Sequence, residues 1–208
     1  MLFRSQSMST EYIAEFPDNM EEINRVVSSA KRELDIMVDV PGYGQYSRPE
    51  ISDLYMQALR KLRPDVTIKM LIYDENSVRE SRRRQFAGRE FSDLMKNKRF
   101  KHYFHDVWPT LGEPNSKEEF MDKLQQKQRD YEKSLLEKQI DIKHVSGRLM
   151  FYLWLADNQE AIFSFQNNSK EEHEISFRTR DGTLINTFKN TFDQTWSSAN
   201  SSVAVPIS

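Results

Sequence analysis

The sequence contains no cysteine, which excludes a disulfide framework, a thiolate nucleophile and a cysteine-ligated zinc site. It has only six glycines, and none of them belongs to a Walker, dinucleotide-binding or nucleophile-elbow pattern. The sequence therefore gives no support for a nucleotide hydrolase, a Rossmann oxidoreductase or an esterase with a nucleophile elbow.

Long apolar segments are absent as well. The longest uninterrupted apolar run covers residues 149–156, whereas a membrane-spanning helix needs about 20 apolar residues. The start of the chain lacks the apolar core of a signal peptide, and a formal net charge of −2 argues against a general attraction to nucleic acids or acidic membranes. We therefore expect a cytoplasmic protein that binds no membrane and uses no cofactor and no metal.

The first third of the chain carries regular apolar patterns. Apolar residues recur at helical spacing over residues 17–32 and alternate with polar residues over residues 33–40. Pro49 opens a second amphipathic helix, and residues 66–73 form a second apolar strand. A helix, strand, helix and strand with short connections predict a parallel strand pair joined by a helical crossover.

The rest of the chain divides into a charged middle and a strand-rich end. We expect residues 75–138 to form a helical insertion whose second long helix docks through an apolar stripe, Phe120, Leu124, Tyr131 and Leu135. Residues 140–179 contain four short apolar segments separated by polar turns, and Asp181 is expected to cap a closing helix.

These patterns predict an α/β fold, a mixed sheet flanked by helices with a helical insertion. A chain of 208 residues suits one such domain. We place the domain at residues 16–196, after a flexible N-terminus at 1–15 and before a flexible tail at 197–208.

Two apolar runs meet at a polar turn that begins with Asp157. Ser164 and Gln166 close the second run, and Glu174 begins the next strand. This order resembles the phospholipase D superfamily, in which a strand bearing His-x-Lys is followed by an Asp in a tight turn, a Ser-x-Asn strand end and a strand containing Glu.

The resemblance covers residues 16–74 and 140–196 and implies one half-unit of the superfamily's fold. At the positions of the family's histidine and lysine, however, the sequence has Met150 and Tyr152. The family's histidine forms a covalent phosphoryl intermediate, and its lysine stabilises the charge of the phosphate. Methionine cannot be phosphorylated and tyrosine is a single neutral donor, so we predict no catalytic residue.

Our leading hypothesis is a catalytically degenerate phospholipase D-like domain that acts as a sensor, regulatory or ligand-binding module. Its ligand would be a phosphorylated or nucleotide-like small molecule, or a protein partner. The vestigial ligand-binding site would consist of Met150, Tyr152, Asp157, Ser164, Gln166 and Glu174. The competing interpretation is ordinary turn polarity and core packing. Because active members of the family join two half-units, the resemblance also implies a homodimer.

A second hypothesis is an active, metal-independent phosphodiesterase or nuclease that uses a non-standard histidine, with the nucleophile supplied by His144, by His173 or by the helical insertion. His102 and His105 with Asp106 have the spacing of a metal site, but this pattern is weak and a surface helix end explains it better.

A third hypothesis is a nucleic-acid-binding protein. Residues 79–101 contain nine basic and three acidic side chains, and arginine forks suit phosphate groups. The candidate anion-binding patch consists of Arg82, Arg83, Arg84, Arg89, Lys98 and Arg99. The alternative interpretation of this segment is a solvated helix face.

Overall fold

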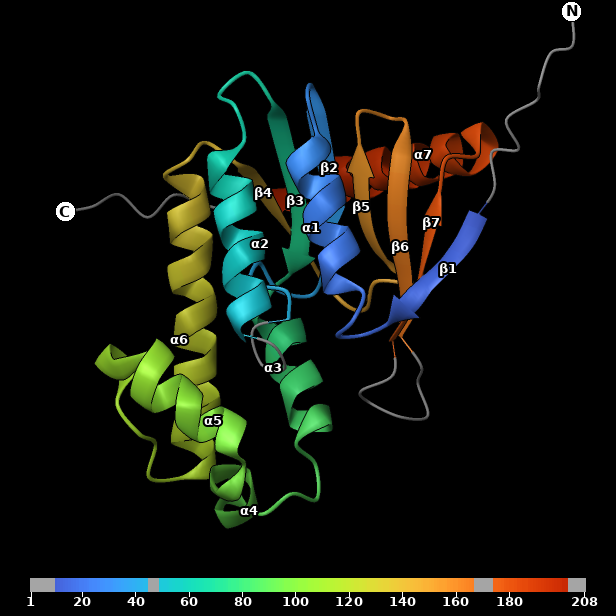
Figure 1. Ribbon diagram of the computed structural model, residues 1–208. Coiled ribbons are helices and arrows are strands. Elements are labelled where there is room, and N and C mark those ends of the chain that lie inside the picture. Colours follow the sequence, from blue (N-terminus) through green and yellow to red (C-terminus); the bar gives the residue numbers. More distant parts are fainter. Residues whose placement is uncertain (1–9, 45–48, 167–173, 202–208) are drawn as a thin grey trace, which may run out of the picture.

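The computed structural model describes residues 10–44, 49–166 and 174–201, and in this part of the chain eight strands form a single mixed sheet (Figure 1). The strands are β1 (Thr10–Glu15), β2 (Glu33–Met37), β3 (Thr67–Tyr73), β4 (Asp141–Val145), β5 (Tyr152–Ala156), β6 (Glu160–Gln166), β7 (Glu174–Thr179) and β8 (Asn200–Ser201). Their order in the sheet is β1-β7-β6-β5-β2-β3-β4-β8. The helices are α1 (Met20–Ser29), α2 (Pro49–Lys61), α3 (Glu75–Gln85), α4 (Phe91–Lys96), α5 (Lys98–His102), α6 (Lys117–Leu136) and α7 (Gly182–Ser198), with short turns η1 (Tyr103–Val107) and η2 (Pro109–Leu111) between α5 and α6.

The centre of the sheet is the predicted parallel unit. β2 pairs with β3 in parallel, and β3 pairs with β4 in parallel, so the carboxyl ends of these strands lie at one edge of the sheet. β5, β6 and β7 extend the sheet in antiparallel fashion on the other side of β2. The α/β class and the mixed sheet flanked by helices are therefore confirmed.

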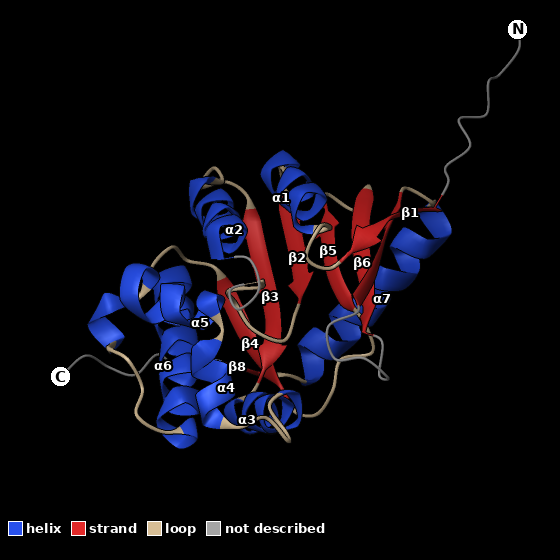
Figure 2. Cartoon of the chain, turned by 60° about the horizontal axis from the view of Figure 1, so that its bottom comes forward, coloured by secondary structure: helices blue, strands red, loops and turns tan. Residues whose placement is uncertain are grey.

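Helices cover both faces of the sheet (Figure 2). α1 and α2 lie over one face, where Leu34 and Trp154 are fully buried. α7 lies over the opposite face and buries Phe188 and Phe192 against apolar side chains of β5 and β6. A central strand covered on both faces must be apolar throughout, and the five-residue β5, with the sequence YLWLA, fits this requirement.

The segment between β3 and β4 is helical and is joined to the main core through α6. Phe120 and Leu124 of α6 pack with Phe86, which follows α3, and with aromatic residues of α5 and η1, in a small core within the insertion. Tyr131 and Leu135, two turns further along α6, belong to the core of the main domain. The stripe of apolar residues on α6 thus contacts two cores, which anchors the insertion to the sheet.

The ordered domain extends further at both ends than the sequence patterns suggested. β1, in the segment expected to be a flexible N-terminus, pairs antiparallel with β7, from Thr10 opposite Thr179 to Glu15 opposite Ile175. α7 continues to Ser198, and β8 then adds a short edge strand beside β4. The physical reason for β1 is that β7 would otherwise expose a row of unpaired backbone groups. A short and mostly polar strand gives too little periodicity to be found from sequence.

Side chains cap three of the described helices at their N-termini. Asp181 caps α7, as predicted, through the N–H groups of Thr183 and Leu184, and Ser116 accepts a hydrogen bond from the backbone N–H of Glu119 at the start of α6. Asp74 caps α3 by accepting from the N–H of Ser77 at 2.8 Å. Within the described residues, none of the helices is both long and apolar enough to cross a membrane.

Candidate functional site

A buried polar cluster lies on the α1 side of the sheet, at the edge where β2 ends. Tyr152 on β5 is opposite Ser164 on β6, and Ser164 is opposite Ser176 on β7, so the three side chains form one row across the strands. Glu174, two residues before Ser176, extends the row toward the end of the sheet. The exposed fractions are 2% for Tyr152, 0% for Ser164 and 8% for Glu174.

Hydrogen bonds connect this row to α1 and to the loop after β2. Tyr43 donates its hydroxyl to Glu174 Oε1 at 2.5 Å, and Ser164 also bonds to the Glu174 carboxylate. The Ser164 and Ser176 hydroxyls are 2.7 Å apart. The Asn19 amide donates to Ser176 Oγ at 2.6 Å and to the Tyr43 hydroxyl at 3.3 Å. The cluster is thus a network of buried side chains, in which Asn19 Oδ1 has no hydrogen-bond partner among the described residues.

Burial dominates the electrostatics of the cluster. It raises the pKa of Glu174 to about 7, although hydrogen bonds from Tyr43 and Ser164 favour the charged form. Asp39, just after β2, also has a raised pKa because it is desolvated, while the nearby Arg82 guanidinium and a hydrogen bond from Tyr152 act in the opposite direction. Ionisation of these carboxyl groups would place negative charge in a poorly solvated site, and their neutral forms offer no positive charge to an anion. This cluster is therefore unfavourable for phosphate.

The structure separates Asp157 from this cluster. Asp157 lies in the turn between β5 and β6, so the five residues of β5 place it about 17 Å from Tyr152 along an extended strand. Its carboxylate accepts hydrogen bonds from the backbone N–H groups of Lys31, Arg32 and Glu33 at 2.7–3.2 Å. Asp157 thus fastens the connection between α1 and β2.

Comparison with known proteins gives matches among solved structures. No family model matches the sequence, and no curated protein matches it either. The structure is similar to Nuc, a phospholipase D family member from Salmonella typhimurium, with 11% identity, a TM-score of 0.54 and coverage of 94% of this chain and 99% of Nuc. The chain has the phospholipase D fold. At 11% identity, the likeness shows the fold alone, so the chemistry of the site has to be argued from the residues of this chain.

A second solved structure is TrmBL2, an archaeal chromatin protein described as showing a novel mode of DNA binding. The identity is 11% and the TM-score is 0.50. The match covers 96% of this chain but 57% of TrmBL2, so this chain spans a little over half the length of that protein.

In this domain of phospholipase D-like fold, the two residues that the sequence resemblance assigned to the catalytic positions do not share a site. Met150 precedes β5 and is 86% exposed, whereas Tyr152 is buried in the cluster. Burial, with the nearby Asp39 and Glu174 carboxylates, raises the pKa of Tyr152 well above its usual value, so the phenol stays protonated. Gln166 ends β6 opposite Glu174 in the ladder. The predicted set thus divides into Tyr152, Ser164 and Glu174 in the cluster, Met150 on the surface and Asp157 at the far end of β5.

Among the described residues, no histidine supplies a substitute nucleophile in the cluster. His144 lies on β4, three strands from β5 in the sheet order, or about 14 Å at the usual strand spacing. Its Nε2 atom is 3.1 Å from Glu132 Oε1 on α6, and this hydrogen bond raises the pKa of His144. His173 lies outside the described residues.

The insertion carries no metal site in its described residues, where no group of three or more metal-ligating side chains occurs. His102 Nδ1 is 2.8 Å from Asp106 Oδ2 one helical turn later, and His105 faces Glu113 at 3.4 Å. These contacts are exposed pairs on the surface, as the sequence suggested.

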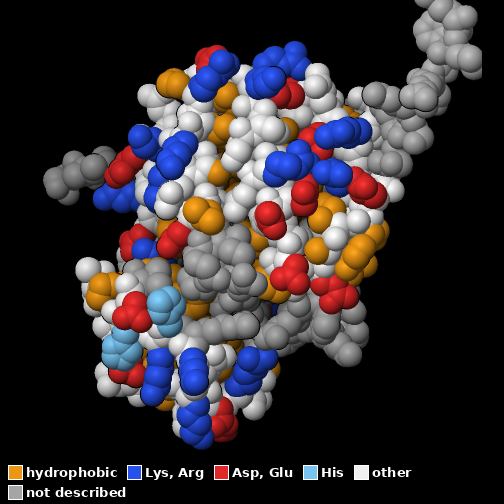
Figure 3. Space-filling model, viewed as in Figure 1, with side chains coloured by type: hydrophobic (Ala, Val, Ile, Leu, Met, Phe, Trp, Pro, Cys, Tyr) orange, Lys and Arg blue, Asp and Glu red, His pale blue; other side chains and the backbone are white. Residues whose placement is uncertain are grey.

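The basic segment is not a single surface. Arg82 is buried and lies near Asp39, whereas Arg83, Arg84 and Arg89 are exposed. Lys98 is exposed as well, and the side chain of Arg99 lies outside the described residues. Figure 3 shows several Lys and Arg side chains gathered at the end of the molecule formed by the insertion, over α3 and α4.

Sequence reasoning missed four members of the cluster, Asn19, Asp39, Tyr43 and Ser176. A signal existed for two of them, because Asp39 and Tyr43 follow a strand whose carboxyl end is the usual ligand end of an open α/β sheet. Asn19 occupies the N-cap position of α1 but makes no capping bond with its side chain. Its amide is used by the cluster, which only the tertiary packing reveals.

Proposed function

We propose that this phospholipase D-like domain is catalytically degenerate and works as a regulatory or sensor module that binds a ligand. The observation that supports this most is the hydrogen-bonded network around Glu174, whose carboxyl group is engaged by Tyr43 and Ser164. The sequence resemblance assigns Tyr152 to the position of the family's lysine, and this buried tyrosine stays protonated.

Three physical reasons argue against phosphoryl transfer at this cluster. A nucleophile must reach the phosphorus atom, and the side chains of the row are almost completely buried. The developing negative charge needs a cation or free donors, whereas the Tyr43 hydroxyl and the Asn19 amide already donate to Glu174 and to Ser176. Tyr43 and Tyr152 are both protonated because burial raises their pKa values well above the usual range.

The purified protein is expected to hydrolyse neither a chromogenic phosphodiester nor single-stranded DNA above the buffer rate, with EDTA present and a commercial phosphodiesterase as positive control. Metal-independent turnover that stays with the protein through purification would overturn the proposal. If turnover is found, His144→Ala and His173→Ala identify the nucleophile, because loss of turnover in either variant would establish the enzymatic alternative. Tyr152→Phe is the matched control, since it removes the cluster hydroxyl without touching a histidine.

DNA binding is a second candidate function. It is favoured by the likeness to TrmBL2 and by the exposed Arg83, Arg84 and Arg89 of the basic segment. This candidate predicts that affinity for a fluorescent DNA duplex falls steeply between 50 and 200 mM salt, by roughly 10³-fold or more if about six phosphates are contacted.

The double variant Arg84→Ala and Arg89→Ala should then bind DNA more weakly. The slope of the logarithm of affinity against the logarithm of salt concentration should fall by the amount expected for about two phosphate contacts. Arg63→Ala, an exposed arginine after α2 that pairs with Asp65, is the matched control. Equal affinity of the double variant and the control would contradict this candidate.

A further inference from the structure

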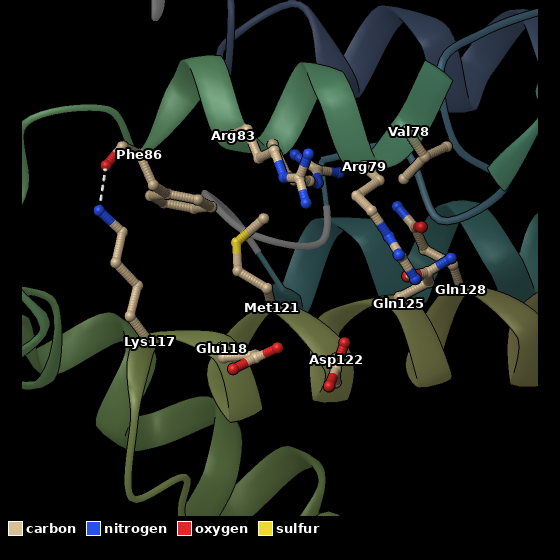
Figure 4. Close-up of a pocket in the computed structure, with 11 residues that line it drawn as sticks. Val78, Arg79, Arg83, Phe86, Lys117, Glu118, Met121, Asp122, Gln125 and Gln128 are labelled. Carbon is tan, nitrogen blue, oxygen red and sulfur yellow. Dashed lines mark hydrogen bonds between the residues drawn. The ribbon is translucent and has the colours of Figure 1, made fainter. Parts of the chain in front are cut away.

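A pocket of about 440 Å³ lies between α3 and α6, apart from the sheet cluster (Figure 4). Arg79 and Arg83 project into it from α3, and Gln125 and Gln128 project from α6 at the same end as Arg79. Phe86 and Met121 form the opposite, apolar end. A volume of this size is in the range of small-molecule sites.

The two glutamines are the most informative residues of the pocket. Gln125 and Gln128 are 8% and 6% exposed, and the Nε2 atom of each has no hydrogen-bond partner among the described residues. Gln125 only accepts, through Oε1, a long hydrogen bond of 3.4 Å from Arg79. Buried amide donors almost always have a partner. Two unpaired donors side by side therefore indicate an acceptor that the protein itself does not provide.

The charges of the pocket are arranged in two walls. Arg79 and Arg83 are one turn apart on α3, and Glu118 and Asp122 are one turn apart on α6. The walls do not neutralise each other, because Arg83, Glu118 and Asp122 form no ion pair with another described residue. A ligand with an anionic group and several hydroxyl groups would satisfy both walls.

Lys117 closes the apolar end and keeps the walls in place. Its ammonium group donates to the backbone carbonyl groups of Phe86 at 2.7 Å and Arg89 at 2.8 Å (Figure 4 shows the first of these bonds). These bonds join the start of α6 to the end of α3. The two helices thus form a preformed groove, which lowers the entropic cost of binding.

We propose that this pocket binds a small organic phosphate of mononucleotide size. The phosphate lies between Arg79 and Arg83 on α3 and the two glutamines on α6, because a tetrahedral group can accept from arginine forks and amides at once. The ligand hydroxyls donate to Glu118 and Asp122, and the apolar part of the ligand packs on Phe86 and Met121. This inference names the ligand class of the proposed regulatory module and rests on that proposed function.

The test is calorimetric titration with the four ribonucleoside monophosphates, the four nucleosides and inorganic phosphate. At least one monophosphate is expected to bind at least about tenfold more tightly than its nucleoside and than inorganic phosphate. Arg83→Ala and Gln128→Leu should each weaken that binding by about tenfold or more, because hydrogen bonds to a charged group are lost. Arg84→Ala, on the same helix but paired with Glu80 outside the pocket, should bind as the wild type does.

Gln128→Leu also provides a readout that a merely structural role would not give. Because it removes a buried, unpaired donor, this variant should unfold at the same or a higher temperature than the wild type while losing affinity. Absence of binding by all four monophosphates at about 1 mM, or full affinity in both Arg83→Ala and Gln128→Leu, would overturn the proposal.

The phosphodiesterase assay on the same preparation separates this proposal from the proposed function. Monophosphate binding without diester hydrolysis supports both. Binding accompanied by hydrolysis would support the proposal for the pocket and overturn the proposed non-catalytic role. If the protein shows neither binding nor hydrolysis, the proposal for the pocket is overturned and the proposed non-catalytic role is not.

Discussion

Asp157→Ala is expected to lower the free energy of unfolding by about 2–3 kcal/mol, with no effect on ligand binding in the α3–α6 pocket. The carboxylate accepts from three consecutive backbone N–H groups that begin β2, with the shortest bond, 2.7 Å, from Arg32. Asp157 also has a φ of 54°, a left-handed conformation that aspartate tolerates better than alanine does. Urea denaturation at pH 7 measures the change.

Asp157→Asn is the matched control for this prediction. It retains one carbonyl oxygen for the N–H groups of Arg32 and Glu33 and also tolerates the left-handed conformation, so we expect it to lose less than half as much stability. Burial alone would raise the pKa of Asp157, but the backbone N–H groups of Glu33, Arg32 and Lys31 together lower it. The charge-dependent part of the stabilisation is therefore present above the unfolded-state pKa and is lost as pH falls through the lower, folded-state pKa.

A different outcome would indicate that Asp157 takes part in ligand binding. If Asp157→Ala unfolded like the wild type but bound a monophosphate more weakly, its position in the turn would be functional and not structural. The hydrogen bonds to the start of β2 would then have no measurable role.

Sequence periodicity was sufficient to predict the central sheet. Its strands are either buried on both faces, which gives continuous apolar runs, or alternate strictly between apolar and polar residues. The same periodicity explains which predicted site residues meet. Tyr152 and Ser164 face each other because the β5–β6 hairpin turns at Asp157, and this geometry necessarily places Asp157 at the far end of both strands. The spacing of Tyr152 and Asp157 along one strand already predicts that they lie far apart, whereas the family motif suggested that they belong to one site.

The contacts made by Asn19 and Tyr43 could not be predicted in this way. They depend on how α1 and the loop after β2 pack on the sheet, over sequence separations of 131 residues between Tyr43 and Glu174 and 157 between Asn19 and Ser176. The α3–α6 pocket is also a tertiary feature, although the basic segment that lines it was visible in the sequence. The expected homodimer stays a prediction.

Glu174 is expected to make the protein less stable as the pH rises from about 4.5 to about 7. The ordinary pKa of this carboxyl group is 4.5, and burial raises the pKa to about 7 in the folded protein. Below this window the group is protonated in both states. Within it, the unfolded chain releases the proton while the folded protein retains it, so each increase in pH favours unfolding. Above pH 7 both states are ionised, and the accumulated loss is about 3 kcal/mol.

The variant Glu174→Gln isolates this effect. Asp39 and His144 also have raised pKa values and shift the wild-type curve in the same direction, so the wild-type curve alone does not identify Glu174. Glutamine still offers an oxygen to Tyr43 and Ser164 but does not ionise. We expect Glu174→Gln to be more stable than the wild type by about 2–3 kcal/mol at pH 8, and similar to it at pH 4.5.

Urea denaturation of both proteins across this pH range decides whether the cluster is closed in solution. Glu137→Gln, which changes an exposed carboxylate at the end of α6, is the control for a general charge effect. A stability difference for Glu174→Gln that does not change with pH would mean that the Glu174 carboxylate is solvated and ionised at neutral pH. A solvated carboxylate could act on a bound substrate, so this result would reopen the enzymatic hypothesis. A difference that grows as the pH rises would instead show that the Glu174 carboxyl group is desolvated in the folded protein, which agrees with the proposed non-catalytic role.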